Sequence, residues 1–221
     1  MTDVVPFEEL STCDLRRKWI YAAGTAGNVG DEPMHHLLKV GNQGGIRFAG
    51  PSEQPRLVAL FSTPNHDDWP DTIDQERRLV RYHGDNRLAA DRIDEAKGNR
   101  MLRSVFARGF ATEKARHTCP PFFVFSVAGE PGLPKRSQRF EGLAVPGAPG
   151  IPTEDWLLGK WYERTSGRFE NYLLTLTLLD ADVIARSWID ELHAGESTGL
   201  SAPHAFQKWV IGGHRAPDGD R

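Results

Sequence analysis

Much of this chain consists of short apolar or β-branched runs separated by glycine- or proline-containing breaks, a pattern typical of strands joined by turns. Several runs lack a clean alternation of apolar and polar positions, as expected of strands buried on both faces in a strongly curved sheet or barrel. The predicted strands occupy residues 46–49, 57–62, 78–83, 121–127, 138–145, 155–163 and 168–179.

Two other segments have a helical period. Residues 98–108 place their apolar side chains on one face and their arginines on the other. Residues 180–195 start at an aspartate, a favourable N-cap, repeat apolar residues every four positions and end at a glycine, a favourable C′ residue. We therefore expect a single α+β domain over residues 1–211 with a curved sheet or barrel at its centre, followed by a disordered tail at 212–221.

The composition limits the possible classes of protein. With 39% hydrophobic and 26% charged residues, the chain is typical of a globular protein. It contains neither an apolar window long enough to cross a membrane nor a secretory signal, so we expect a cytoplasmic, nucleoid-associated protein without a membrane partner. Cys13 and Cys119 are far apart and the histidines are scattered, so we expect no disulfide, metal or other cofactor.

Charge is distributed unevenly along the chain. The formal net charge is −3, which argues against holding nucleic acid by bulk electrostatics. Residues 77–116, however, contain eleven lysines and arginines and five acids, a local excess of about six positive charges. Such a window is typical of a nucleic-acid-binding face, unless acids elsewhere in the fold compensate it.

Residues 65–87 carry the most informative chemistry. Acidic residues and a tryptophan in a proline-bent turn precede an aromatic strand that ends near Tyr82. A protein that extracts cytosine from the base stack needs aromatic faces to hold the ring and a carboxylate to accept from the N4 amino group. One hairpin supplies both groups.

At this point the sequence resembles a known family. The motifs that carry the resemblance are GNQGGIR (41–47), DDWPD (67–71), RYHGDNR (81–87), KGNRML (97–102), FFVFSVAG (122–129), RFEGLAVPG (139–147) and RFENY (168–172). Their order and spacing resemble the SRA-like modified-cytosine-binding domains at the N-terminus of modification-dependent restriction enzymes of the AspBHI and MspJI type. The resemblance covers most of the chain. It implies an α+β, SRA-like twisted β-barrel with flanking helices that flips 5-methylcytosine or a related base out of duplex DNA.

The resemblance also implies a base pocket. Tyr82 matches the family's tyrosine that stacks on the flipped base. Asp71 matches the acid that binds the Watson–Crick edge, and Asp68 is the alternative if the hairpin is longer. The opposite wall has three candidates, Trp69, His66 and Phe61. Each of these residues also has a structural alternative, because a strand tyrosine can belong to the core, aspartates cap turns and a tryptophan before proline can be a packed anchor.

Further residues are expected to contact the duplex. If the glycine-rich segment 41–45 enters the DNA as a finger, Gln43 offers donors and acceptors that can replace the lost base-pair partner. The same segment could instead be a tight structural turn. The other expected contacts are polar or basic residues of the matched motifs: Arg47, Arg81, Arg87, Lys97, Asn99, Arg100 and Arg103.

A nuclease site is the main alternative. Asp71, Glu95 and Lys97 satisfy a PD…ExK pattern, in which paired carboxylates hold Mg²⁺. The ExK part of such sites lies on an apolar strand, whereas residues 91–100 are polar and lead into a helix, so we expect no catalytic residues. Restriction enzymes of this type carry a cleavage domain after the reader, and this chain ends too soon to hold one. We therefore expect a stand-alone reader of double-stranded DNA with modified cytosine, or a reader for which a separate nuclease or effector protein supplies cleavage.

Overall fold

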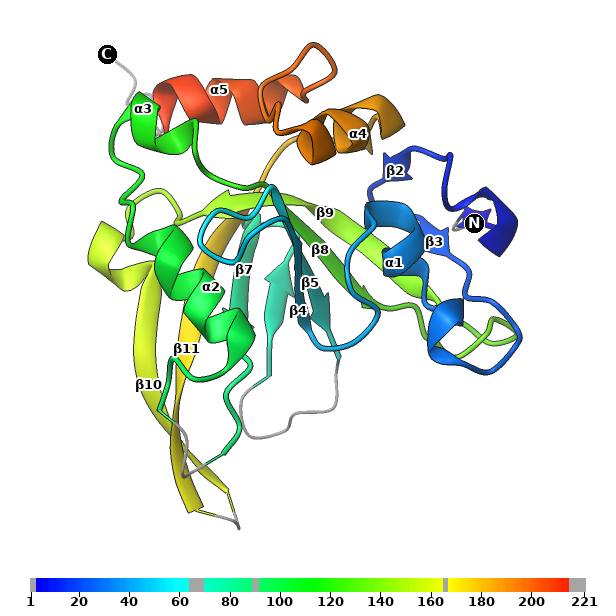
Figure 1. Ribbon diagram of the computed structural model, residues 1–221, viewed down its shortest axis with the longest axis horizontal. Coiled ribbons are helices and arrows are strands. Elements are labelled where there is room, and N and C mark those ends of the chain that lie inside the picture. The colour runs from blue at the N-terminus through cyan, green and yellow to red at the C-terminus, as the bar shows by residue number, and fades with distance from the viewer. Residues whose placement is uncertain (1–2, 64–69, 89–91, 165–166, 215–221) are drawn as a thin grey trace.

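The computed structural model describes residues 3–63, 70–88, 92–164 and 167–214 (Figure 1). Its strands are β1 (Val4–Val5), β2 (Leu15–Arg16), β3 (Ile20–Tyr21), β4 (Ile46–Ala49), β5 (Leu57–Ser62), β6 (Thr72–Asp74), β7 (Leu79–His83), β8 (Phe122–Val127), β9 (Gln138–Pro146), β10 (Leu157–Arg164), β11 (Gly167–Leu178) and β12 (Val183–Ile184). Its helices are α1 (Pro33–Leu38), α2 (Lys97–Phe106), α3 (Glu113–Arg116), α4 (Arg186–Ala194) and α5 (His204–Gly212), with 3-10 turns at Phe7–Glu9, Val29–Asp31 and Thr153–Asp155. Together these elements form one mixed α+β domain.

The described strands build a ten-stranded sheet with the central order β4-β5-β8-β9-β11-β7-β6. Strand β10 pairs with β11 along its whole length, β3 pairs with both β1 and β9, and the small pair β2–β12 lies apart from the main sheet. Most pairs are antiparallel, but β5 runs parallel to β8 and β1 runs parallel to β3. Strands β6 and β7 form the hairpin that was expected to supply the groups that bind cytosine. They lie at one end of this order, and β4 and β5 lie at the other.

The sheet is strongly curved but it is not a closed barrel, so the predicted barrel is wrong. Among the described residues, the end strands β4 and β6 pair only with β5 and β7 respectively, and no ladder joins them. The curvature nevertheless brings the two ends together. The Tyr82 hydroxyl on β7 donates to the Phe61 carbonyl on β5 at 3.0 Å, although three strands separate β5 from β7 in the sheet. A shift of register between Val124 and Phe125 of β8, typical of a β-bulge, adds to the bend.

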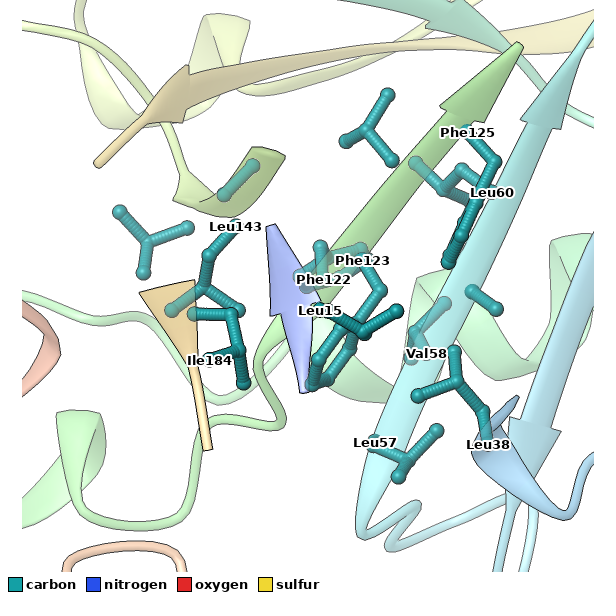
Figure 2. Packing of buried hydrophobic residues seen from close by; sticks show 14 of the residues in the cluster. Leu15, Leu38, Leu57, Val58, Leu60, Phe122, Phe123, Phe125, Leu143 and Ile184 are labelled. Carbon is teal, nitrogen blue, oxygen red and sulfur yellow. The ribbon is translucent and has the colours of Figure 1, made fainter. Parts of the chain in front are cut away.

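The core explains why the strand pattern did not alternate. Phe122, Phe123, Val124 and Phe125 are consecutive in β8, and all four are fully buried. One face of β8 packs within the curve of the sheet and the other lies under flanking segments, so both faces are apolar, as predicted. Figure 2 shows the phenylalanines among residues of β5, β9 and the β2–β12 pair.

The helices cover the sheet at its edges. In Figure 1, α4 and α5 lie over the upper end of the sheet, and α2 lies beside β10 and β11. The predicted helix 180–195 is shorter than expected, because β12 occupies its start and α4 begins only at Arg186; it does end at Gly195, which has a φ of 96°. Helix α5 and strand β6 were not predicted. None of the helices in the described ranges is long and apolar enough to cross a membrane.

Residues 212–214, which were expected to belong to the tail, are part of the domain. Gly212 is the last residue of α5, and His214 packs back onto the domain with its Nε2 atom 2.7 Å from the Pro146 carbonyl oxygen. Its ring also lies edge-on to Trp156, at 5.6 Å between centroids. Residues 215–221 lie outside the described residues.

Candidate functional site

A cavity of about 510 Å³ lies where β5 and β7 end and β4 and β9 begin. This volume is in the range of small-molecule and cofactor sites. Segments far apart in the sequence line it: residues 29, 32, 42–45, 47, 61, 63, 71, 82, 87, 127, 135, 136 and 138. Curvature of the sheet is what brings these segments together.

Tyr82 and Phe61 form aromatic surface of this cavity. Tyr82 is 4% exposed, and its hydroxyl is held by the Phe61 carbonyl oxygen. Burial raises the pKa of the Tyr82 hydroxyl, so the group remains a protonated donor. The structural alternative for Tyr82 was a core residue with a paired hydroxyl. The hydroxyl is indeed paired, and the side chain also lines the cavity.

Asp71 lies just before β6, and β7 holds its carboxylate in place. Its Oδ1 atom accepts from the His83 backbone N at 2.8 Å and lies 3.2 Å from His83 Nδ1. Both side chains are nearly buried, and the His83 ring packs edge-on against Tyr162 at 5.3 Å. No described residue hydrogen-bonds Asp71 Oδ2, and Asp71 is one of the residues that line the cavity.

The segment 41–45 is shaped by its glycines and by the cavity wall. The backbone N of Phe61 donates to the Gly45 carbonyl at 2.8 Å, and Gly44 has a φ of 84°, where glycine is favoured. A Cβ atom on Gly45 would lie 2.6 Å from the Tyr82 hydroxyl oxygen, so only glycine fits against that ring. Gln43 is exposed on this segment and lines the cavity. The segment is therefore anchored at its end as a structural turn and still presents Gln43 at the cavity.

Arg47 is a buried member of the wall rather than an exposed DNA contact. Its Nη1 atom lies 2.6 Å from Oε1 of Glu32, and the two side chains are 5% and 4% exposed. Arg47 Nε donates to the Gly44 carbonyl at 2.8 Å, and Gln138 Nε2 donates to the same Glu32 Oε1. The other carboxylate oxygen of Glu32 caps α1 by accepting from His35 N at 3.0 Å. Glu32 and Arg47 thus hold the glycine turn against α1, and the expected duplex contact from Arg47 is not available in this conformation.

Of the remaining residues predicted to contact DNA, one lines the cavity and five do not. Arg87 lines the cavity together with Asp71, Tyr82, Phe61 and Gln43. The others do not line it: Arg81, Lys97, Asn99, Arg100 and Arg103. Arg81 alternates with Tyr82 on β7, so its side chain leaves the opposite face of the strand.

Asn99 is used inside the fold. It is fully buried, its Oδ1 accepts from Asp85 N at 2.9 Å, and its Nδ2 donates to Ile93 O and to Asn171 Oδ1 at 2.6 and 2.9 Å. Asp85 in turn caps α2 by accepting from the backbone N atoms of Gly98 and Asn99. Asn99 therefore fixes the segment after β7, and its buried side-chain amide binds groups within the fold.

Of the eleven cations in the 77–116 window, four form ion pairs with described acids: Arg77, Arg78, Arg92 and Arg103. Arg77 and Arg78 pair with Asp74 and Asp180 at 3.8 and 3.2 Å, and Arg103 pairs with Asp94. Arg108 and the buried Arg116 donate to backbone carbonyls instead. Lys97 lies over the Phe48 ring at 5.1 Å, while Arg100 is exposed. The alternative of compensation by acids thus applies to part of the window.

Some predicted site residues cannot be placed. His66, Asp68 and Trp69 lie outside the described residues, so Asp68 as the acid and His66 or Trp69 as the second wall stay predictions. Phe61 is the candidate wall residue that lines the cavity.

The nuclease alternative finds no support in this geometry. Asp71 is bonded to His83 at the cavity, whereas Lys97 is the first residue of α2, so the ExK segment leads into a helix instead of lying on a strand. In the described ranges, no three His, Cys, Asp or Glu residues are grouped so as to hold a metal ion.

The chain is similar to the DNA recognition domain of the cytosine modification-dependent restriction endonuclease LpnPI, with a TM-score of 0.86 and 30% sequence identity over 100% of this chain and 99% of that one. The DNA modification-dependent restriction endonuclease AspBHI matches with a TM-score of 0.86 and 33% identity over 97% of this chain and 54% of that chain. MspJI, solved with a 27-mer oligonucleotide, shares the fold at a TM-score of 0.69 and 22% identity, over 94% of this chain and 55% of that one.

The family model for the N-terminal part of restriction endonuclease AspBHI matches residues 16–218, so this chain belongs to that family. It is homologous to the DNA recognition domains of modification-dependent restriction enzymes, which confirms the resemblance stated from the motifs. The chain spans about half the length of the AspBHI and MspJI chains. No curated protein sequence matched it.

Sequence reasoning missed several residues of the cavity. His83 orients Asp71, and it was quoted only as part of a motif. Glu32 and Gln138 were not considered because their contacts with Arg47 and with each other join segments more than ten residues apart. Lys135 and Arg136 also line the cavity and lie outside the window of high positive charge.

Proposed function

We propose that this chain binds duplex DNA containing modified cytosine and receives the modified base, flipped out of the helix, in the cavity at the edge of the sheet. The observation that carries the proposal is the meeting of Asp71, Tyr82 and Phe61 in one cavity of suitable size. The LpnPI and AspBHI relatives are modification-dependent restriction endonucleases, which supports the choice of modified DNA.

The chemistry of a cytosine edge fits this wall. The Oδ2 atom of Asp71 would accept from the N4 amino group, and His83 keeps the carboxylate in position through Oδ1. The ring of Tyr82 would stack on the base, with Phe61 as the described aromatic neighbour. Flipping costs a few kcal/mol, whereas one base–aromatic stack returns about 1–3 kcal/mol and a hydrogen bond to a charged acceptor about 1.5–3 kcal/mol. These terms are large enough to hold a flipped base.

The modification itself would be read by apolar surface. Val29 and Val127 line the same cavity, and a methyl group that fills an apolar notch contributes about 0.8 kcal/mol. Gln43 would occupy the space that the base leaves in the duplex, because it is the exposed amide of the turn beside the cavity.

The role of Asp71 can be tested by Asp71→Asn. We expect binding of a duplex with 5-methylcytosine to weaken by about 1.5–3 kcal/mol. The reason is that the amide has one acceptor oxygen, whereas the carboxylate has one for His83 N and one for the N4 amino group. Fluorescence anisotropy at fixed salt measures the change. Asp74→Asn is the matched control, since Asp74 lies in the same hairpin but binds Arg77 N outside the cavity.

Equal losses in the two variants would mean that the hairpin, and not the carboxylate in the cavity, matters for binding. A loss in Asp68→Asn with none in Asp71→Asn would assign the acid to Asp68.

We further propose that this chain acts as a reader and that cleavage, where it occurs, is supplied by a separate nuclease or effector protein. The LpnPI match, which is to an isolated recognition domain, supports a reader without a nuclease site of its own.

This makes a prediction about cleavage. Incubation of the chain with modified duplex and Mg²⁺ or Mn²⁺ is expected to leave the DNA intact on a denaturing gel, because Asp71, Glu95 and Lys97 are placed on different elements and Lys97 packs on Phe48. Nicking that disappears in both Asp71→Asn and Lys97→Ala would restore the PD…ExK interpretation.

A further inference from the structure

Two neighbouring cations stand at the rim of the cavity on a tight turn. Ser137 N donates to the Pro134 carbonyl at 2.9 Å, which makes Lys135 and Arg136 the two central residues of a four-residue turn between β8 and β9. Both residues are exposed and both line the cavity that holds Asp71 and Tyr82.

The turn is anchored at its base. Ser137 is 2% exposed, and its Oγ atom accepts from Ala23 N at 3.1 Å. The next residue, Gln138, is bonded to the buried Glu32. Arg139 pairs with Glu130 at the other end of the connection. The backbone that presents Lys135 and Arg136 is therefore tied to the cavity wall from both sides.

Acids near the rim do not neutralise this pair. Among the described residues, neither Lys135 nor Arg136 has an ion-pair or hydrogen-bond partner. Of the acids in this region, Glu32 pairs with Arg47, Glu130 pairs with Arg139, and the Oδ1 atom of Asp71 is bonded to His83. Arg87 adds a third cation to the same cavity lining.

We propose that the Lys135–Arg136 turn binds the phosphodiester backbone of duplex DNA beside the flipped nucleotide. Exposed cations on a fixed turn suit phosphate oxygens, which position a protein on DNA without carrying sequence information. Besides the buried Arg47, the cations that line the cavity are Arg87, Lys135 and Arg136, and the last two are adjacent on this exposed turn. The inference rests on the proposed function, because it takes the cavity to be the place where the base enters.

The test is the salt dependence of binding by the full chain. In Lys135→Gln/Arg136→Gln, the slope of log affinity against log salt is expected to become shallower by about 0.9 for each lost phosphate contact, hence by about 1.8 for the pair. Affinity should fall alike for duplexes with cytosine and with 5-methylcytosine, so their ratio should stay that of the unaltered protein.

Lys114→Gln/Lys208→Gln is the matched control. It removes the same charge from exposed residues of α3 and α5, at the opposite end of the sheet in Figure 1. Equal slopes for the two double variants would overturn the proposal, as would a failure of the chain to bind either duplex. If the unaltered protein binds both duplexes equally, the base-reading function fails, yet a shallower slope in the turn variant alone would still establish the phosphate contact.

Discussion

Glu32→Gln is expected to lower the free energy of unfolding by about 3–5 kcal/mol, the cost of leaving one partner of a buried ion pair uncompensated. Arg47 would keep its charge at a site where its side chain is 5% exposed, with no other acid in contact among the described residues. Gln138 and the N-terminus of α1 would also lose a charged acceptor. Urea denaturation followed by circular dichroism measures the loss.

Asp182→Asn is the matched control for this prediction. Asp182 and Arg17 also lie 2.6 Å apart, but the aspartate side chain is 72% exposed, so its loss should cost at most about 1 kcal/mol. Glu32→Gln/Arg47→Met should regain part of the stability, because removing both charges leaves no buried ion. If Glu32→Gln costs no more than Asp182→Asn, the buried pair does not support the cavity wall.

Tyr82→Leu is expected to weaken binding of a duplex with 5-methylcytosine by about 1–3 kcal/mol, the range for loss of one base–aromatic stack. Leucine keeps apolar volume at a position that is 4% exposed, whereas alanine would open a cavity and confuse folding with binding. Titration of labelled duplex with protein shown to be folded at the assay temperature measures the change.

Tyr82→Phe separates the ring from its hydroxyl. The phenyl ring can still stack, and only the hydrogen bond to the Phe61 carbonyl is lost, at a cost to stability of about 0.5–1.5 kcal/mol. Binding by Tyr82→Phe should therefore stay close to that of the unaltered protein. Identical affinities for the Leu and Phe variants would place Tyr82 in the core and remove it from base binding.

The strands could be predicted closely because their local signals agree with the fold. The runs 46–49 and 57–62 match β4 and β5, and 121–127 matches β8 within one residue. Apolar runs between glycine and proline breaks identify such strands even when both faces are buried. Strand β6 was missed because Thr72–Asp74 has only one apolar residue, and β6 is held by its pairing with β7.

Closure of the sheet could not be predicted, because it depends on whether the end strands pair. The sequence pattern is the same for a closed barrel and for an open sheet that curves until Tyr82 reaches Phe61. The resemblance favoured closure, and the strand order shows an open edge where the cavity lies.

The candidate site was predicted where one hairpin supplies the residues and missed where distant segments meet. Asp71 and Tyr82 are eleven residues apart in the chain and share a cavity, as the hairpin suggested. The Glu32–Arg47 pair and the Lys135–Arg136 turn come from other segments that only the curved sheet brings there. Charge counting along the chain placed the DNA contacts on residues 77–116, because a linear window cannot show which cations are paired in space.

The most direct test of the central claim is a binding titration of one duplex sequence made with cytosine, 5-methylcytosine or 5-hydroxymethylcytosine at a single position, at fixed salt and with a 2-aminopurine beside that position. The proposed function predicts tighter binding of a modified duplex than of the unmodified one, with a rise in 2-aminopurine fluorescence as the neighbouring base leaves the stack. Equal affinity for the three duplexes, with no change in fluorescence, would contradict it.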